Sequence, residues 1–293
     1  MQSTFGWVDF LEEDKNKMYE LIKLLSEQET LDELGIGSIR DAFSNLFFPG
    51  TSTIQTRVKY MFFIPWIYQR IEDYQSDNSK IDTLIKSIEV ELIDELQKSE
   101  DTVGIIGKNS REKLKRTPAD IYWAGLKRWG ILKSNISKVD FHQYLSNFNK
   151  LKEQQLIDDD NNPVNGTNLS HWDQGISESP EDFPKNAIFN LRYEDAIYLK
   201  DKIKQNCKES LMANLLDLNM TSDCKYIWDH PGLINIPQEL ANQILNAQYF
   251  ADIIQGASLL YNLMLSEADE NLFNDKVEEY RNRFRRWKDN TFL

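Results

Sequence analysis

VKYMFFIPWIYQRI, residues 58–71, is the stretch that decides the fold. Its apolar residues are nearly continuous, and a helix that is apolar on all sides is typical of the centre of a core. We therefore predict a central helix that begins behind Thr51, Ser52 and Thr53, whose hydroxyl groups can cap its first N–H groups. Pro65 has no backbone N–H, so it is expected to kink or restart this helix.

Helical periodicity extends outward from this stretch. Ile81, Ile85 and Leu92 recur at helical spacing, and Thr117 before Pro118 has the form of an N-cap followed by proline at the first helical position. The helices expected beyond the central one lie at 11–27, 39–47, 80–98, 118–130, 139–155, 191–206, 208–218, 238–247, 249–266 and 270–288. Only one short stretch, VGIIG at 103–107, favours a strand, so the sequence predicts an all-α fold.

Residues 158–187 interrupt the helical pattern. They are rich in Asp, Asn, Gly, Ser and Pro, a composition typical of loops and linkers. We predict two helical lobes joined by this acidic polar loop: an N-terminal helical domain, 1–157, and a C-terminal helical domain, 188–293. The N-terminal domain would contain a helix-turn-helix-like pair at 118–130 and 139–155.

The composition is that of a globular protein with an acidic balance. Hydrophobic residues make up 41% of the 293, enough for a sizeable core, and the net charge is −13. Two cysteines are too few for a disulfide framework, and the start MQSTFGWVDF does not resemble a signal peptide. The most apolar stretch, 249–265, is short for a membrane span and contains Asp252, so we expect a buried helix there. These features predict a cytoplasmic protein with no membrane association.

Basic residues are concentrated between Lys108 and Lys133, against the acidic balance of the chain. That segment has eight basic and two acidic residues. Phosphate contacts to DNA would use Arg111, Lys113, Lys115, Arg116, Lys127, Arg128 and Lys133. The alternative is an αα-hairpin with a solvated basic face, because any two helices joined by a short turn match the same outline. Residues 281–288 form a possible second patch.

A phosphate-type anion site is conceivable in FPGTSTIQTRVK, residues 48–59. Small hydroxyl residues before a helix leave backbone N–H groups free for an anion, so Thr51, Ser52 and Thr53 are candidates, with Arg57 adding charge. The alternative, which we favour, is an ordinary helix cap with Arg57 in a structural ion pair.

The sequence patterns of familiar catalytic sites are absent. The chain has no G-x-x-x-x-G-K-[ST] phosphate loop, no G-x-S-x-G elbow and no H-E-x-x-H metal motif. His142, His171 and His230 do not have metal-ligand spacing. We therefore predict no catalytic residue, no metal and no cofactor.

Five blocks carry a family resemblance. They are GWVDF at 6–10, DELGIGSIRDAFSNLFFPGTSTIQTRVKYMFFIPWIY at 32–68, IYWAGLKRWGI at 121–131, YEDAIYLKDKI at 193–203 and GASLLYNLML at 256–265. Together they resemble a bacterial family known as domain of unknown function 6361. The resemblance implies a gene neighbourhood of antiviral defence, beside helicase-like and phospholipase D-like nuclease proteins, and a family length greater than that of this chain. It supplies no catalytic residues.

These observations favour a non-catalytic accessory or scaffold subunit of a bacterial antiviral defence or DNA-processing complex, with helicase-like or nuclease-like partners from the same operon. One alternative is direct DNA binding through the basic helical face 108–133. A second alternative is a cryptic nuclease or nucleotide-processing enzyme.

Overall fold

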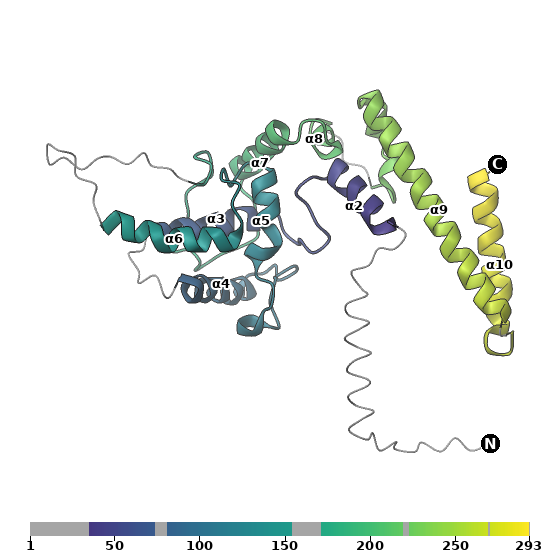
Figure 1. The fold of residues 1–293 in the computed structure, drawn as a ribbon, viewed down its shortest axis with the longest axis horizontal. Coiled ribbons are helices and arrows are strands. Elements are labelled where there is room, and N and C mark those ends of the chain that lie inside the picture. The colour runs from purple at the N-terminus through teal and green to yellow at the C-terminus, as the bar shows by residue number, and fades with distance from the viewer. Residues whose placement is uncertain (1–34, 74–80, 154–170, 219–222, 269, 293) are drawn as a thin grey trace, which may run out of the picture. The chain divides into compact units, whose positions relative to one another are not determined.

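The structure, a computed structural model, describes residues 35–73, 81–153, 171–218, 223–268 and 270–292. It confirms a predominantly α-helical fold (Figure 1). The helices are α2 (Ile36–Phe47), α3 (Tyr60–Asp73), α4 (Ile81–Lys98), α5 (Pro118–Arg128), α6 (Lys138–Glu153), α7 (Tyr193–Asn206), α8 (Leu211–Leu215), α9 (Gln238–Ala268) and α10 (Glu270–Phe292), with short 3-10 helices η2 (Arg111–Lys113), η3 (Ile227–Asp229) and η4 (Pro231–Asn235). The helix predicted at 11–27 lies outside the described residues.

The weak strand signal at 103–107 does not correspond to a strand. These residues make turns, because Gly104 and Gly107 have φ angles of 79° and 84°, in the left-handed region that strands do not use. Pairing of the β type is confined, within the described ranges, to one bridge between Leu132 and Trp172.

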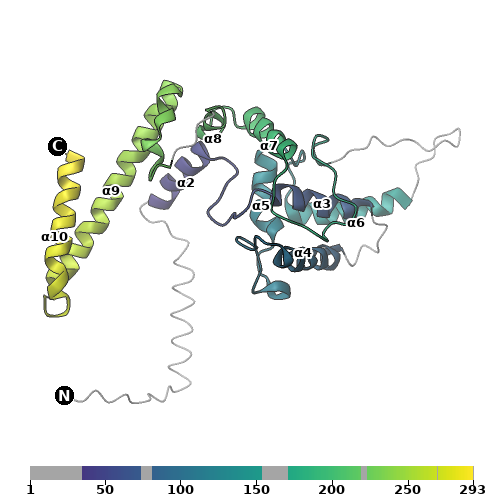
Figure 2. The same cartoon turned by 180° about the vertical axis from the view of Figure 1, so that it is seen from behind.

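The chain divides into two compact units, residues 1–45 and 46–293. In the second unit, α3 contacts α4 and α5, and α6 contacts the same two helices (Figures 1 and 2). The domain division at 158–187 stays a prediction. The described part of that stretch, from residue 171 onward, supplies Trp172 and Phe183 to the core around α3, where the Phe183 ring lies 5.3 Å from that of Trp66.

The prediction of a central helix at 58–71 is confirmed in α3. Every residue from Tyr60 to Tyr68 is buried, so this helix is covered on all sides. α3 continues through Pro65 without a restart, although Pro65 cannot donate a backbone hydrogen bond. Rings of neighbouring segments surround it: Tyr68 lies 5.3 Å from Trp123 of α5, and Phe63 lies 5.8 Å from Phe183.

The predicted start of this helix is wrong. α3 begins at Tyr60, well after Thr51, Ser52 and Thr53. The reason is a tertiary contact, because the buried Tyr122 hydroxyl of α5 accepts hydrogen bonds from the N–H groups of Thr56 (2.8 Å) and Arg57 (3.0 Å). Those N–H groups are thereby held in a turn ahead of the helix.

The N-terminal start of α5 agrees with the sequence prediction. The Thr117 hydroxyl accepts from the backbone N–H of Asp120, and the Asp120 carboxylate accepts from the N–H of Thr117, which makes a capping box with Pro118 at the first helical position. Sequence signals therefore set the start of α5, whereas a side chain from elsewhere sets the start of α3.

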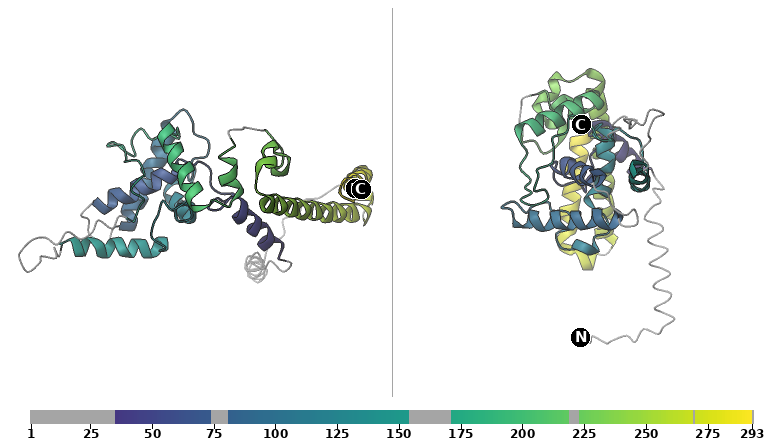
Figure 3. Two further views of the ribbon diagram at one scale, coloured as in Figure 1. Left: turned by 90° about the horizontal axis from the view of Figure 1, so that it is seen from above. Right: turned by 90° about the vertical axis from the view of Figure 1, so that its left-hand side faces the viewer.

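α9 and α10 form an antiparallel hairpin (Figures 1 and 2), and α9 is one long helix rather than the two predicted (Figure 3). Gly256 lies against the Trp287 indole, whose Nε1 donates to the backbone oxygen of Asp252 at 2.8 Å. An ion pair between Arg281 and Glu267, with an N–O distance of 2.8 Å, joins the two helices near the turn.

Gly256→Ala is expected to loosen this hairpin. A methyl group at this position would overlap the Trp287 ring, so the helices must separate, at a cost of about 1–3 kcal/mol. Hydrogen exchange of the α9 and α10 amides should accelerate, while exchange in α3 should not change. Asn262→Ala, on an exposed position of α9, is the control. Unchanged exchange in Gly256→Ala would contradict the close contact.

Candidate functional site

The predicted nucleic-acid residues do not form one continuous face. Lys113, Lys115 and Arg116 are exposed just before α5, and Arg128 is exposed at its last residue. The 11 residues of α5 separate these groups by about 16 Å along the helix axis. The basic run of the sequence is therefore divided between the two ends of one helix.

The remaining basic candidates are partly engaged. Arg111 pairs with Asp94 of α4, and Lys133 lies 3.8 Å from Asp173. Lys127 is half-buried. The helix pair also differs from a helix-turn-helix, because α5 ends at Arg128 and α6 begins at Lys138, whereas that motif has a turn of about three or four residues.

The anion-site candidates are placed apart from a helix N-terminus. The Thr51 hydroxyl donates to the backbone oxygen of Phe48 at 2.7 Å, and Ser52 and Thr53 are exposed in a turn. Arg57 pairs with Asp101, donates from Nε to the Val103 oxygen at 2.9 Å, and lies over the Phe189 ring at 5.2 Å. This geometry matches the structural ion pair that the sequence also allowed.

A buried ion-pair cluster that the sequence analysis missed lies between α3 and α7. Lys59 Nζ is 2.8 Å from an oxygen of Asp195, and Arg192 binds both oxygens of the same carboxylate. The Lys59 and Asp195 side chains are 7% and 1% exposed, whereas Arg192 is 59% exposed. Burial alone would raise the pKa of Asp195, but hydrogen bonds from Arg192 and Lys59 outweigh burial and lower the pKa to about 2.

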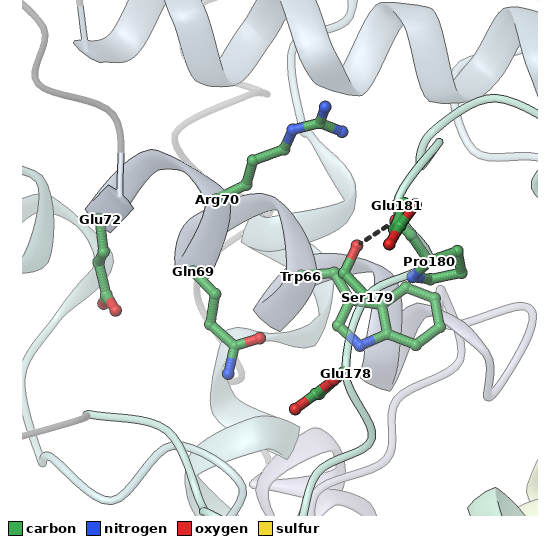
Figure 4. Close-up of a pocket in the computed structure, with 8 residues that line it drawn as sticks. All are labelled: Trp66, Gln69, Arg70, Glu72, Glu178, Ser179, Pro180 and Glu181. Atoms are coloured by element: carbon green, nitrogen blue, oxygen red, sulfur yellow. Dashed lines mark hydrogen bonds between the residues drawn. The ribbon is translucent and has the colours of Figure 1, made fainter.

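Two cavities lie along α3, and the smaller of the two reaches this cluster. One, of about 250 Å³, has Lys59 and Arg192 on its wall together with the rings of Phe63 and Trp66. The other, of about 430 Å³, is lined by Trp66, Gln69, Arg70 and Glu72 of α3 and by residues 178–181. Figure 4 shows the second cavity, in which Gln69 and Glu178 face one another while Arg70 points away. Its three carboxylates and single arginine disfavour an anionic ligand.

His142 has a structural role. Its Nε2 lies 2.8 Å from the Tyr68 hydroxyl, and its Nδ1 contacts Asp82. Burial lowers the pKa of His142 despite the nearby carboxylate, so the neutral ring accepts from Tyr68 and donates to Asp82. Tyr68 is fully buried and Asp82 is exposed, so this chain of hydrogen bonds ties α3, α4 and α6 together from the core to the surface.

Among the described residues, α9 carries a group of exposed apolar side chains. The buried residues of its second half, Gly256, Leu259, Leu263 and Ser266, follow a 3-4-3 spacing along the seam with α10. Seven other large apolar side chains of α9 are between 42% and 63% exposed. They are Leu245, Tyr249, Ile253, Leu260, Tyr261, Met264 and Leu265, which we call the α9 face. The expectation of a buried helix at 249–265 is therefore wrong for this face.

Exposure of this size is unusual for a monomer. Seven side chains exposed to this degree present roughly 700 Å² of surface, above the largest apolar patch of about 300–600 Å² on a typical monomer. α9 carries only Glu239, Asp252 and Glu267 as charged residues among its 31. Apolar surface of this extent with so little charge indicates a surface for protein association.

Two further findings describe what the structure contains. Across the described residues, no helix is long and apolar enough to cross a membrane. In the same part of the chain, no three His, Cys, Asp or Glu side chains are placed together to hold a metal ion.

Comparison with known proteins gives one match. A family model described as "Family of unknown function (DUF6361)" matches residues 2–289. No curated protein and no solved structure matches the chain.

Proposed function

Because the chain belongs to this family of unknown function, DUF6361, we propose its role from its own surfaces: it acts as a non-catalytic accessory or scaffold subunit of a protein complex. The observation that carries the proposal is the α9 face, an apolar surface on a helix with three charged residues among its 31. Apolar surface of this extent is stabilised when another protein covers it.

The nature of the complex is proposed from the family resemblance. We place the protein in the bacterial cytoplasm, in an antiviral defence or DNA-processing complex, with helicase-like or phospholipase D-like nuclease partners from the same operon. The net charge of −13 favours contact with basic surfaces of proteins that themselves bind nucleic acid.

The test is a tagged pull-down from the native host, with and without nuclease treatment. Stoichiometric copurification of proteins encoded beside this chain, unaffected by nuclease, supports the proposal. Recovery of the chain without any of them, or with them only through nucleic acid, contradicts it. The same experiment on a variant with charged residues in the α9 face shows whether this surface holds the partners.

Direct DNA binding is the second candidate, and the exposure of Lys113, Lys115 and Arg116 is the observation that favours it. Changing all three to Glu is expected to weaken binding to duplex DNA and to lower the slope of log K against log salt by about 3. Fluorescence polarisation over a salt series measures both. Lys208→Glu, on an exposed residue of another segment, is the control. Equal binding by all proteins would exclude this cluster as a contact.

A further inference from the structure

The α9–α10 hairpin buries only one seam. On α9 the seam is the 3-4-3 set around Gly256 and Leu263, and α10 contributes Val277 and the paired rings of Phe284 and Trp287, 5.3 Å apart. Helical folds of this kind commonly become stable when two hairpins pack into a bundle of four helices. A two-helix hairpin whose exposed apolar residues flank its buried seam has half of such a bundle.

The exposed residues define a stripe that a second hairpin can cover. Leu245, Tyr249, Ile253, Leu260 and Met264 are separated by 4, 4, 7 and 4 positions. At about 100° per residue, these five side chains fall within an arc of about 100°. Tyr261 and Leu265 widen the stripe on one side. With these two residues, which extend the arc to about 200°, the whole α9 face presents roughly 700 Å², close to the about 800 Å² that each partner buries in a stable interface.

The small number of charges on α9 favours a second copy of this chain as the partner. In a two-fold contact the same surface lies on both subunits, so charged groups on it face like charges. The chain as a whole carries −13 and repels its own copies, but α9 carries only Asp252 between Glu239 and Glu267. This helix is consequently a surface that can face itself with little repulsion.

From these three observations we infer that the α9 face packs against the α9 face of a second copy of this chain, forming a four-helix bundle. The inference rests on the proposed scaffold function and specifies how the scaffold assembles: two copies joined through α9 leave the surfaces of α3 to α7 in each copy available to other partners. An antiparallel arrangement places the two-fold axis near residue 255, the middle of the stripe, so each Ile253 lies within about one turn of its counterpart.

The experiment is the measured mass of the purified full chain in solution over a concentration series. We expect a species of twice 34.4 kDa for the unchanged chain and a shift to monomer for Ile253→Glu, with the dissociation constant raised roughly 100-fold. Gln255→Glu adds the same charge to an exposed position of α9 outside the stripe and should leave the dimer intact. Circular dichroism checks that each variant keeps its helices.

A charge-pair mixture separates loss of the interface from misfolding. Ile253→Glu mixed with Ile253→Lys should restore the dimer as a one-to-one heterodimer, because opposite charges then meet near the axis. A monomer of the unchanged chain at every concentration, or a dimer unaffected by Ile253→Glu, overturns the inference. Monomer together with copurifying neighbours would leave the proposed function standing with a different protein on the α9 face, whereas a dimer without neighbours would contradict the proposed function alone.

Discussion

Asp195→Ala is expected to lower the free energy of unfolding by about 3–5 kcal/mol, because it leaves the Lys59 ammonium buried without its counter-ion. The Lys59 side chain is only 7% exposed, so little bulk water is available to solvate its ammonium group once the carboxylate is removed. The rings of Phe62 and Trp66, whose centroids lie 5.0 and 5.1 Å from Nζ, compensate in part. Urea denaturation near pH 7.5 measures the change.

The converse substitution should cost less. In Lys59→Met, Asp195 keeps both hydrogen bonds from Arg192, so its charge remains paired. The double variant Lys59→Met/Asp195→Leu removes both buried charges and is expected to recover most of the loss in Asp195→Ala, since apolar residues of similar size can replace a buried ion pair. If Lys59→Met proves as harmful as Asp195→Ala, then Arg192 does not neutralise the carboxylate, and the asymmetry that we describe is wrong.

Local signals in the sequence predict much of the helical fold. Thr117 and Pro118 start α5 by contacts within four residues, and a periodic pattern places α4 from Ile81. The start of α3 could not be predicted in this way, because it depends on Tyr122, a residue distant in sequence. The break predicted inside α9 failed because the apolar run continues past residue 248 and no Gly or Pro lies beside that position to stop the helix.

The residues of the candidate site could be predicted less well from the sequence than the helices. An apolar helix has the same sequence pattern whether it packs into the core of its own chain or against another protein. The hydropathy of residues 249–265 therefore could not distinguish a buried helix from a helix with an exposed apolar face. Lys59 did give a signal, a lysine directly before the run YMFFIPWIY, but its partner Asp195 is 136 residues away. A single sequence carries no information that links two positions so far apart.

Glu89→Gln is expected to make the protein more stable at alkaline pH. Glu89 lies on the buried side of α4, 3% exposed, and accepts a hydrogen bond from the Ala119 N–H near the start of α5 at 3.4 Å. Burial raises the pKa of this carboxyl from 4.5 to about 7, and the hydrogen bonds that favour its charged form do not offset burial. Glutamine keeps the shape and the acceptor oxygen but cannot ionise.

The sign of the pH dependence follows from that raised pKa. A carboxyl that binds its proton more tightly in the folded protein contributes stability that is complete below pH 4.5 and is lost as the pH rises towards 7. Relative to Glu89→Gln, the unchanged protein should therefore lose about 2–3 kcal/mol of unfolding free energy between pH 5 and pH 8. Comparing two proteins at each pH cancels the opposite slope that His142 and His171 contribute, since burial lowers the pKa of both imidazoles.

Urea denaturation of both proteins at several pH values between 5 and 8 measures the difference. Glu91→Gln, which removes an exposed carboxylate from the same helix, is the matched control. Its unfolding free energy should change with pH in the same way as that of the unchanged protein. If the unfolding free energy of Glu89→Gln also followed that of the unchanged protein across this pH range, Glu89 would ionise in the folded protein without loss of stability. In that case a carboxylate at the start of α5 is stabilised by the helix N-terminus more strongly than burial opposes it, and the interface between α4 and α5 holds its negative charge throughout this pH range.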